Sequence, residues 1–176
     1  MEASATMTAD DRQAFGDLLQ QHRGIVFKVA NAYARDAEDR ADLAQEIAAQ
    51  LWRAWPGYDP ARRFSTWMYR IALNVAISFL RSDGHRRRHA VPLDEAVHDV
   101  ADDSAVDHEA GESLRMLHRF IGTLDPLNRA LLLLYLEERS TREISEVLGI
   151  SESNVTTKLS RLRQRIRDHA TATGHQ

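Results

Sequence analysis

Apolar residues recur every three or four positions along most of the chain, which is the spacing of one face of an α-helix. In the first part of the chain this spacing predicts one long helix. Its inward face is expected to consist of Phe15, Leu18, Leu19, His22, Val26, Val29, Ala30 and Tyr33. Runs of β-branched residues are few and no Asn-Gly hairpin signal occurs, so strands are not expected. The pattern therefore predicts an all-α protein.

The pattern predicts a second helix after a polar break at Asp36 to Asp39. This helix runs from about Arg40 to Trp55 and ends before Pro56, which disfavours helix at the residue before it. Its inward residues are expected to be Leu43, Ile47 and Leu51.

A third helix is predicted after a loop over residues 56–64. Ser65 can cap this helix, which is expected to run to about Arg81. Its inward residues are expected to be Met68, Ile71, Val75 and Phe79.

Residues 82–111 contain few apolar side chains and many acids, which is typical of a flexible linker. Helices resume near Glu112. Asp125 followed by Pro126 predicts a capped helix start, and the helix that follows is apolar enough to be buried on most sides. The chain is therefore expected to form two small helical domains, over 1–89 and 112–176, joined by an acidic linker over 90–111.

A helix pair joined by a tight turn is predicted over residues 140–167. Ser140 and Glu143 have the spacing of a capping box, and Gly149 stands where the first helix must stop with a positive φ. Ser151 can cap the second helix, with Ile150 and Val155 placed as a hydrophobic staple. An apolar stripe follows at helical spacing, consisting of Val155, Leu159, Leu162 and Ile166.

The opposite face of this second helix is polar and basic. Short hydroxyl side chains and an arginine suit a helix that enters the major groove of DNA, because they allow close approach and bond to base edges. The residues of this face are Thr156, Thr157, Ser160, Arg161 and Gln164. Positive charge that suits phosphates comes from Lys158, Arg163, Arg165 and Arg167. A helical hairpin with a solvated basic face remains the alternative interpretation.

Charge is segregated along the chain, although the net charge is only −3. The basic run consists of Arg81, Arg86, Arg87 and Arg88. The acidic stretch that follows has no Lys or Arg from His89 to Leu114 and contains Asp94, Glu95, Asp99, Asp102, Asp103, Asp107, Glu109 and Glu112. A nearly neutral total can therefore hide a basic nucleic-acid-binding face.

Several classes of protein are not expected. The chain has no cysteine, so disulfides and thiolate zinc sites are excluded. His85 and His89 are four residues apart in an arginine-rich stretch and are expected to be solvated, and no catalytic motif occurs. We expect no metal, no cofactor and no enzymatic activity. With no signal peptide and no apolar run long enough for a membrane span, a cytoplasmic protein is expected.

Arginines and aromatic residues alternate in the segment RRFSTWMYRIALNVAISFLRS. This mixture suits melted or single-stranded nucleic acid, because bases stack on aromatic rings and phosphates attract arginine. The alternative is that Phe64, Trp67 and Tyr69 belong to the core, which we expect for at least two of the three.

The order of these segments resembles the extracytoplasmic-function (ECF) class of bacterial RNA polymerase sigma factors. The resemblance is carried by ADLAQEIAAQLWRAW, by YDPARRFSTWMYRIALNVAISFLR, by VPLDEA in the linker and by LDPLNRALLLLYLEERSTREISEVLGISESNVTTKLSRLR. It covers residues 15–167, and three motifs in register are far more specific than any one of them.

The resemblance implies partners and residue roles. The helix over 42–55 is implied to dock on the β′ clamp helices of core RNA polymerase through Asp42, Gln45, Glu46 and Arg53. The −10 promoter element is implied to contact the loop and third helix, at Tyr58, Arg62, Arg63, Phe64, Ser65, Trp67, Arg70, Asn74 and Arg81. The −35 element is implied to contact Thr156, Thr157, Lys158, Ser160, Arg161, Gln164 and Arg165. The second domain is implied to hold the β flap tip, and an anti-sigma factor is an expected partner.

One departure from the family concerns −35 recognition. Many members carry Lys or Arg at the position of Thr156, and an aromatic residue or His at that of Ser160. The −35 sequence therefore cannot be transferred from other members. A dimeric helix-turn-helix regulator that binds duplex DNA is the second hypothesis. It leaves the first 80 residues unassigned, and no heptad repeat for dimerisation is visible.

Overall fold

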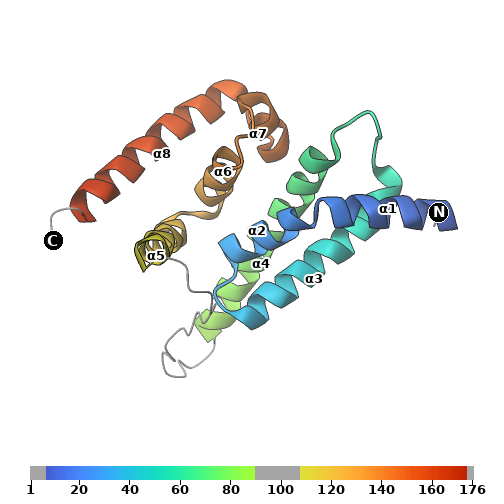
Figure 1. The fold of residues 1–176 in the computed structure, drawn as a ribbon, viewed down its shortest axis with the longest axis horizontal. Coiled ribbons are helices and arrows are strands. Elements are labelled where there is room, and N and C mark those ends of the chain that lie inside the picture. The colour runs from blue at the N-terminus through green and yellow to red at the C-terminus, as the bar shows by residue number, and fades with distance from the viewer. Residues whose placement is uncertain (1–6, 90–107, 174–176) are drawn as a thin grey trace. The chain divides into compact units, whose positions relative to one another are not determined.

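The structure is a computed structural model that describes the backbone of residues 7–89 and 108–173 and the side chains of residues 7–82 and 111–172 (Figure 1). The described residues form α-helices and one short 3₁₀ helix, with no strand among them, which confirms the all-α prediction. The helices are α1 Ala9–Gln21, α2 Arg23–Tyr33, α3 Ala37–Ala54, η1 Trp55–Gly57, α4 Phe64–His89, α5 His108–Thr123, α6 Pro126–Leu136, α7 Thr141–Leu148 and α8 Glu152–Thr173.

The chain divides into two compact units, Met1–Thr123 and Leu124–Gln176. This division places α5 in the first unit, where it contacts α2, whereas the sequence analysis grouped residues from 112 onward with the second domain. Most of the predicted acidic linker, residues 90–107, lies outside the described residues.

The core of the first unit lies between α2, α3 and α4, each of which contacts the other two. Leu43, Ile47 and Leu51 are fully buried on α3, as predicted. The prediction for α4 was partly wrong, because Met68 is buried but Ile71, Val75 and Phe79 are only half-buried. Since both α2 and α3 pack against α4, its buried sector is centred on other residues, namely Tyr69, Ala72, Leu73 and Ala76.

The predicted first long helix is in fact two helices that break at His22. This residue has φ −109° and ψ 14°, and its N–H closes α1 by donating to the Leu18 carbonyl at 3.0 Å. The His22 ring lies 5.2 Å from the ring of Phe64. The side chain at the break thus packs against a residue far away in the sequence.

Two helix boundaries of the first unit also differ from the prediction. Helix α3 begins at Ala37 because Asp36 caps it, accepting from the Asp39 N–H at 2.8 Å. Helix α4 begins at Phe64, so Ser65 lies inside the first turn and does not cap it. It continues to His89, beyond the predicted end near Arg81.

The second unit consists of α6, α7 and α8, which contact one another. Its core contains Leu131, Leu132, Leu134, Ile144, Val147, Val155, Leu159 and Leu162. Asp125 caps α6 and Pro126 is its first residue, as predicted. Arg129 is also buried and donates to the Leu124 carbonyl at 3.1 Å. Helix α6 is therefore buried on most of its length, although Tyr135 and Leu136 at its end are exposed.

Candidate nucleic-acid interface and docking groove

Helices α7 and α8 form the predicted helix-turn-helix, and the predicted caps are present. The Ser140 hydroxyl accepts from the Glu143 N–H at 3.1 Å, and the Glu143 carboxylate accepts from the Ser140 N–H at 2.9 Å. Gly149 has φ 68°, a left-handed conformation that costs glycine little. Ser151 accepts from the Asn154 N–H at 3.1 Å and so caps α8. The turn that presents α8 is therefore fixed by local side-chain chemistry.

The polar face of α8 is exposed and the apolar stripe opposite to it is buried. Val155, Leu159 and Leu162 are buried, and Ile166 is half-buried. The exposed residues are Thr156, Thr157, Ser160, Arg161, Gln164 and Arg165, while Lys158 is half-buried. These side chains share one sector of the helix at helical spacing. An exposed sector of hydroxyls and cations at the front of a helix-turn-helix can contact base edges and phosphates.

Three polar side chains of α8 are already engaged within the helix. The Thr156 hydroxyl donates to the Glu152 carbonyl at 3.0 Å, and the Thr157 hydroxyl donates to the Ser153 carbonyl at 3.1 Å. Gln164 donates to the Asp168 carboxylate at 2.8 Å and accepts from the Arg167 guanidinium at 2.7 Å. These bonds leave each side chain fewer free donors and acceptors than its residue type suggests.

Two arginines of α8 interact with α6 or its cap. The Arg163 guanidinium lies 5.1 Å from the centre of the Tyr135 ring, a cation–π contact that the sequence analysis missed. Arg165 lies near enough to Asp125 to affect its titration. Burial alone would raise the pKa of Asp125. Hydrogen bonds from Asn128 and the charge of Arg165 outweigh burial and lower the pKa below its usual value.

An aromatic cluster supports the loop between η1 and α4. The Tyr58 ring stacks on Trp55 at 5.2 Å between ring centres, and it meets Phe64 and Trp67 at 5.6 and 5.0 Å. The Tyr58 hydroxyl donates to the Arg62 carbonyl at 2.8 Å. Partial burial, with a smaller contribution from the charge of Asp59, raises the pKa of Tyr58. The ring and the hydroxyl of Tyr58 therefore both hold the loop in shape.

The aromatic residues predicted for the −10 interface differ in accessibility. Phe64 and Tyr69 are buried, which confirms that at least two of the three candidate rings belong to the core, while Trp67 is half-buried. The arginines at the end of the loop, Arg62 and Arg63, are exposed. The buried Phe64 ring is thus a support for the loop, and the loop presents its cations outward.

The other predicted −10 residues lie on one exposed stripe of α4. Arg70, Asn74 and Arg81 are all exposed, and their spacing places them within one sector of the helix. Ser65 is half-buried in the first turn. The structure therefore brings the polar candidates of α4 onto a common face that follows the arginine loop in the chain.

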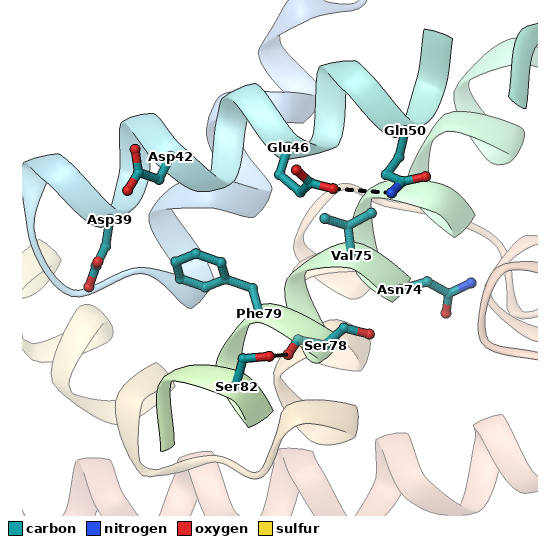
Figure 2. A pocket seen from close by; sticks show the side chains of 9 residues that line it. All are labelled: Asp39, Asp42, Glu46, Gln50, Asn74, Val75, Ser78, Phe79 and Ser82. Carbon is teal, nitrogen blue, oxygen red and sulfur yellow. Dashed lines mark hydrogen bonds between the residues drawn. The ribbon is translucent and has the colours of Figure 1, made fainter. Parts of the chain in front are cut away.

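An open groove of about 470 Å³ lies between α3 and α4 (Figure 2). Its lining includes Asp39, Asp42, Glu46 and Gln50 from α3 and Asn74, Val75, Ser78, Phe79 and Ser82 from α4. Gln45 and Ala49 line an adjoining hollow with Asp42, Glu46 and Phe79. The groove thus joins an acidic wall to an apolar patch formed by Phe79 and Val75.

The groove and the adjoining hollow together contain three of the four predicted polymerase-docking residues, Asp42, Gln45 and Glu46. Arg53 is exposed near the end of α3 and does not line it. Sequence reasoning placed Phe79 in the core and so missed its part in this surface. The Phe79 ring reaches toward α3 near Asp39 and Asp42 (Figure 2). The sequence did contain an indication of this role for Phe79. The apolar sector of α4 is wider than one neighbouring helix can cover, so part of it must face another surface.

The described side chains contain no group of three or more His, Asp or Glu residues that could hold a metal ion. None of the described helices combines the length and the apolar character that a membrane span requires. His85 and His89 lie outside the described side chains.

Two family descriptions match the chain, and together they cover both units. Sigma-70 region 2 matches residues 18–86, which include α3, the arginine loop and most of α4. Sigma-70, region 4 matches residues 114–166, which include the helix-turn-helix. The chain belongs to the sigma-70 family of RNA polymerase sigma factors.

Within that family, the chain belongs to the ECF class. It is 25% identical over 170 residues to the ECF RNA polymerase sigma factor SigW of Bacillus subtilis, with 89% of each chain covered. It is 26% identical over 167 residues to the ECF RNA polymerase sigma factor SigM of Mycobacterium tuberculosis, with 94% of this chain and 81% of the relative covered. A probable RNA polymerase sigma factor, RfaY of Xanthomonas campestris, is 29% identical, but the match spans only 40% of that relative.

Solved structures share the fold. The sigma factor CnrH, solved in complex with the cytosolic domain of CnrY, aligns with a TM-score of 0.67 over 92% of this chain and 90% of that chain, at 23% identity. The sigma factor RpoE from Bartonella quintana, solved with the anti-sigma factor NepR, aligns with a TM-score of 0.66 over 93% of this chain and 98% of that chain, at 16% identity.

Proposed function

We propose that this chain is an alternative sigma factor that binds core RNA polymerase and directs initiation at promoters with specific −35 and −10 elements. The main support is the helix-turn-helix of α7 and α8, which has an exposed polar face. It lies after the region 2 match in the chain, and sigma factors have regions 2 and 4 in this order. The polymerase performs the chemistry, so the chain itself needs no catalytic group. Its site of action is then the bacterial cytoplasm.

The second hypothesis, a dimeric helix-turn-helix regulator, is not favoured. It accounts for α7 and α8 but leaves the first unit without a role. The region 2 match assigns residues 18–86 of that unit to the same family as the helix-turn-helix.

For the −35 element, we assign contacts to the exposed face of α8. Thr156, Thr157, Ser160 and Arg161 face outward at the front of the helix and are assigned to base edges. Lys158 and Arg165 are assigned to phosphates, which position the helix. Gln164 is exposed, but its amide is engaged by Asp168 and Arg167, so we assign it a weaker role.

For the −10 element, we assign contacts to the arginine loop and the exposed stripe of α4. Arg62, Arg63, Arg70 and Arg81 are exposed cations that suit the phosphates of a melted strand, and Asn74 can hydrogen-bond a base. Trp67 and Ser65 line the start of the helix, while Tyr58 and Phe64 support the loop from within. Flipping a base costs a few kcal/mol, and a loop held in one shape in advance lowers the ordering cost that adds to it.

For core RNA polymerase, we assign the groove between α3 and α4. Its acidic wall suits a basic helical partner, such as the β′ clamp helices, and Phe79 offers an apolar contact beside it. Arg53 is assigned to the outer part of the same interface. The exposed Tyr135 and Leu136 are assigned to the β flap tip. An anti-sigma factor that covers the groove would hold the chain inactive, and the similar sigma factor RpoE from Bartonella quintana is solved in complex with the anti-sigma factor NepR.

The proposal is tested by mixing the purified chain with bacterial core polymerase and a library of randomised promoters, and then sequencing the transcripts. Specific initiation with two enriched elements is the expected result. Binding of duplex DNA without any binding of core polymerase would favour the regulator hypothesis instead.

The docking groove is tested in the same assay with a double variant, Gln45→Ala with Glu46→Ala. We expect weaker binding to core polymerase with little loss of stability, because both side chains are exposed. Glu38→Ala is the matched control, since Glu38 is an exposed acid of the same helix that does not line the groove. Equal affinity of the double variant and the control would exclude this docking face.

A further inference from the structure

The hydroxyl hydrogens of Thr156 and Thr157 are used inside α8. Each hydroxyl donates to a carbonyl one turn earlier in the helix, Thr156 to Glu152 at 3.0 Å and Thr157 to Ser153 at 3.1 Å. A hydroxyl has one hydrogen, so neither group can donate to another acceptor while these bonds persist. In the major groove a purine is marked by acceptor atoms, namely N7 of both purines and O6 of guanine. The two threonines therefore have no hydrogen to donate to these atoms.

The methyl groups of the two threonines remain for contact. The Cβ of threonine carries a hydroxyl, a methyl and a hydrogen, and the hydroxyl is turned back along the helix. Both side chains are exposed, so each methyl is available for contact beside the acceptor lone pairs that its hydroxyl oxygen keeps. The C5-methyl of thymine is the apolar group of the major groove, and a threonine methyl is one of the groups that contact it.

Ser160 and Arg161 differ from the threonines, although they lie on the same face. Within the described part of the chain, neither the Ser160 hydroxyl nor the Arg161 guanidinium has a hydrogen-bond or ion-pair partner. Both side chains are exposed and keep their donors for base or phosphate oxygens and for purine N7. The exposed face of α8 therefore has two parts. Thr156 and Thr157 in the second turn offer methyl groups, and Ser160 and Arg161 in the next turn offer hydrogen-bond donors.

We infer that Thr156 and Thr157 are specificity-determining residues that select thymine in the −35 element through contact between methyl groups. Donor readout of purines then falls to Ser160 and Arg161. The inference rests on the proposed function, because it assumes that α8 enters the major groove of the −35 element. It differs from the expectation from residue type alone, in which both threonine hydroxyls donate hydrogen bonds to base edges.

The test uses the holoenzyme assembled from the full-length chain and core polymerase. A −35 element is first selected from randomised promoters, and each thymine in it is then replaced by deoxyuridine, which lacks only the C5-methyl. We expect the affinity of the holoenzyme to fall about fourfold at each thymine that a threonine methyl contacts, from the transfer free energy of one buried carbon. Equal affinity for thymine and uracil at every position would overturn the inference.

Two double variants separate the methyl from the hydroxyl. Thr156→Val with Thr157→Val keeps a methyl and the branched shape, and we expect it to keep the preference for thymine over uracil. Thr156→Ser with Thr157→Ser keeps both hydroxyls, and we expect it to bind thymine and uracil promoters equally. The opposite pattern, in which the serine variant keeps the preference and the valine variant loses it, would show that the hydroxyls read the bases and would overturn the inference.

Failure of the inference can be told apart from failure of the proposed function. If no −35 sequence is enriched by the wild-type holoenzyme, the proposed function fails and the inference fails with it. If a −35 element is enriched but its recognition ignores the thymine methyls, only the inference fails. Affinity for core polymerase, which α8 is not proposed to contact, serves as the folding control for all variants.

Discussion

Two turn residues of the second unit have left-handed backbones, and only one of them is a glycine. Gly149 has φ 68° and Glu138 has φ 55°. Glu138 follows the end of α6, where its N–H donates to Tyr135 at 3.0 Å and the Arg139 N–H donates to Leu134 at 3.1 Å. These are the two bonds of a Schellman motif, a turn whose left-handed position is usually glycine. A side chain at this position costs about 1–2 kcal/mol.

Opposite substitutions at these two positions are expected to have opposite effects. Glu138→Gly should stabilise the second unit by about 1 kcal/mol, because relief of the left-handed penalty exceeds the entropy that glycine loses. Gly149→Ala should destabilise it by a similar amount for the same reason, since an added Cβ meets no other atom within 4 Å. Urea unfolding measures both, and destabilisation by Glu138→Gly would contradict the conformational argument.

The cap residue of α6 is expected to make stability depend on pH. The folded-state pKa of Asp125 is lowered, so its ionised form stabilises the folded chain at pH values above the unfolded pKa of about 3.9. This contribution is lost as pH falls through the lower, folded pKa. In urea unfolding, the stability difference between wild type and Asp125→Asn should therefore shrink below about pH 4. Asparagine caps equally well without a charge, and a difference that does not change with pH would contradict the prediction.

Contacts within a few residues could be predicted from the sequence, whereas contacts between elements could not. Ser140, Ser151 and Asp125 act on groups three residues away, so residue type and spacing identify them. The contact of Arg163 with Tyr135 depends on how α8 packs against α6. Its basic side chain was therefore predicted to face phosphate, with no indication of the ring beneath it.

At the scale of elements, the sequence predicted which segments are helical better than it predicted which faces they bury. The face of α3 was correct because its three inward leucine and isoleucine residues form a narrow stripe. The face of α4 was misplaced because two helices pack against it and its apolar sector is wide. The break at His22 was missed because the apolar spacing continues across it. The resemblance supplied the candidate sites, and only the structure showed that Phe79 joins the docking groove.

Helix α1 has one buried side chain, that of Phe15. Phe15 is 5% exposed and meets Trp52 and Trp55 edge-on at 5.2 and 5.3 Å. Phe15→Ala should cost about 3 kcal/mol, the lower end for a buried phenylalanine. The loss should concentrate in α1, whose amides should exchange hydrogen faster than those of α2 and α3. Hydrogen exchange followed by mass spectrometry measures this difference.

Phe27→Ala is the matched control for the Phe15 variant. The Phe27 side chain is 57% exposed, so its removal should leave both stability and exchange nearly unchanged. Uniformly faster exchange across the whole first unit of the Phe15 variant would contradict a local attachment and indicate that Phe15 belongs to the cooperative core.

Binding of the whole molecule to DNA depends either on its net charge or on the charge close to the bound phosphates. The chain carries a net charge of −3, which by itself repels DNA. The exposed face of α8 nevertheless presents cations with no acidic residue between Glu152 and Asp168. Salt screens charges beyond about 8 Å at physiological ionic strength, so a phosphate bound at α8 responds mainly to charges within that distance of it.

The salt dependence of promoter binding is therefore expected to change when cations are removed from α8. Lys158→Gln with Arg165→Gln should reduce the slope of log affinity against log salt by about 2 for the holoenzyme, because each phosphate contact contributes close to one. Arg23→Gln with Arg35→Gln removes the same net charge at exposed positions of the first unit and should leave the slope unchanged. Equal changes for both pairs would mean that net charge governs binding, and the face of α8 would then lose its assigned role toward phosphates.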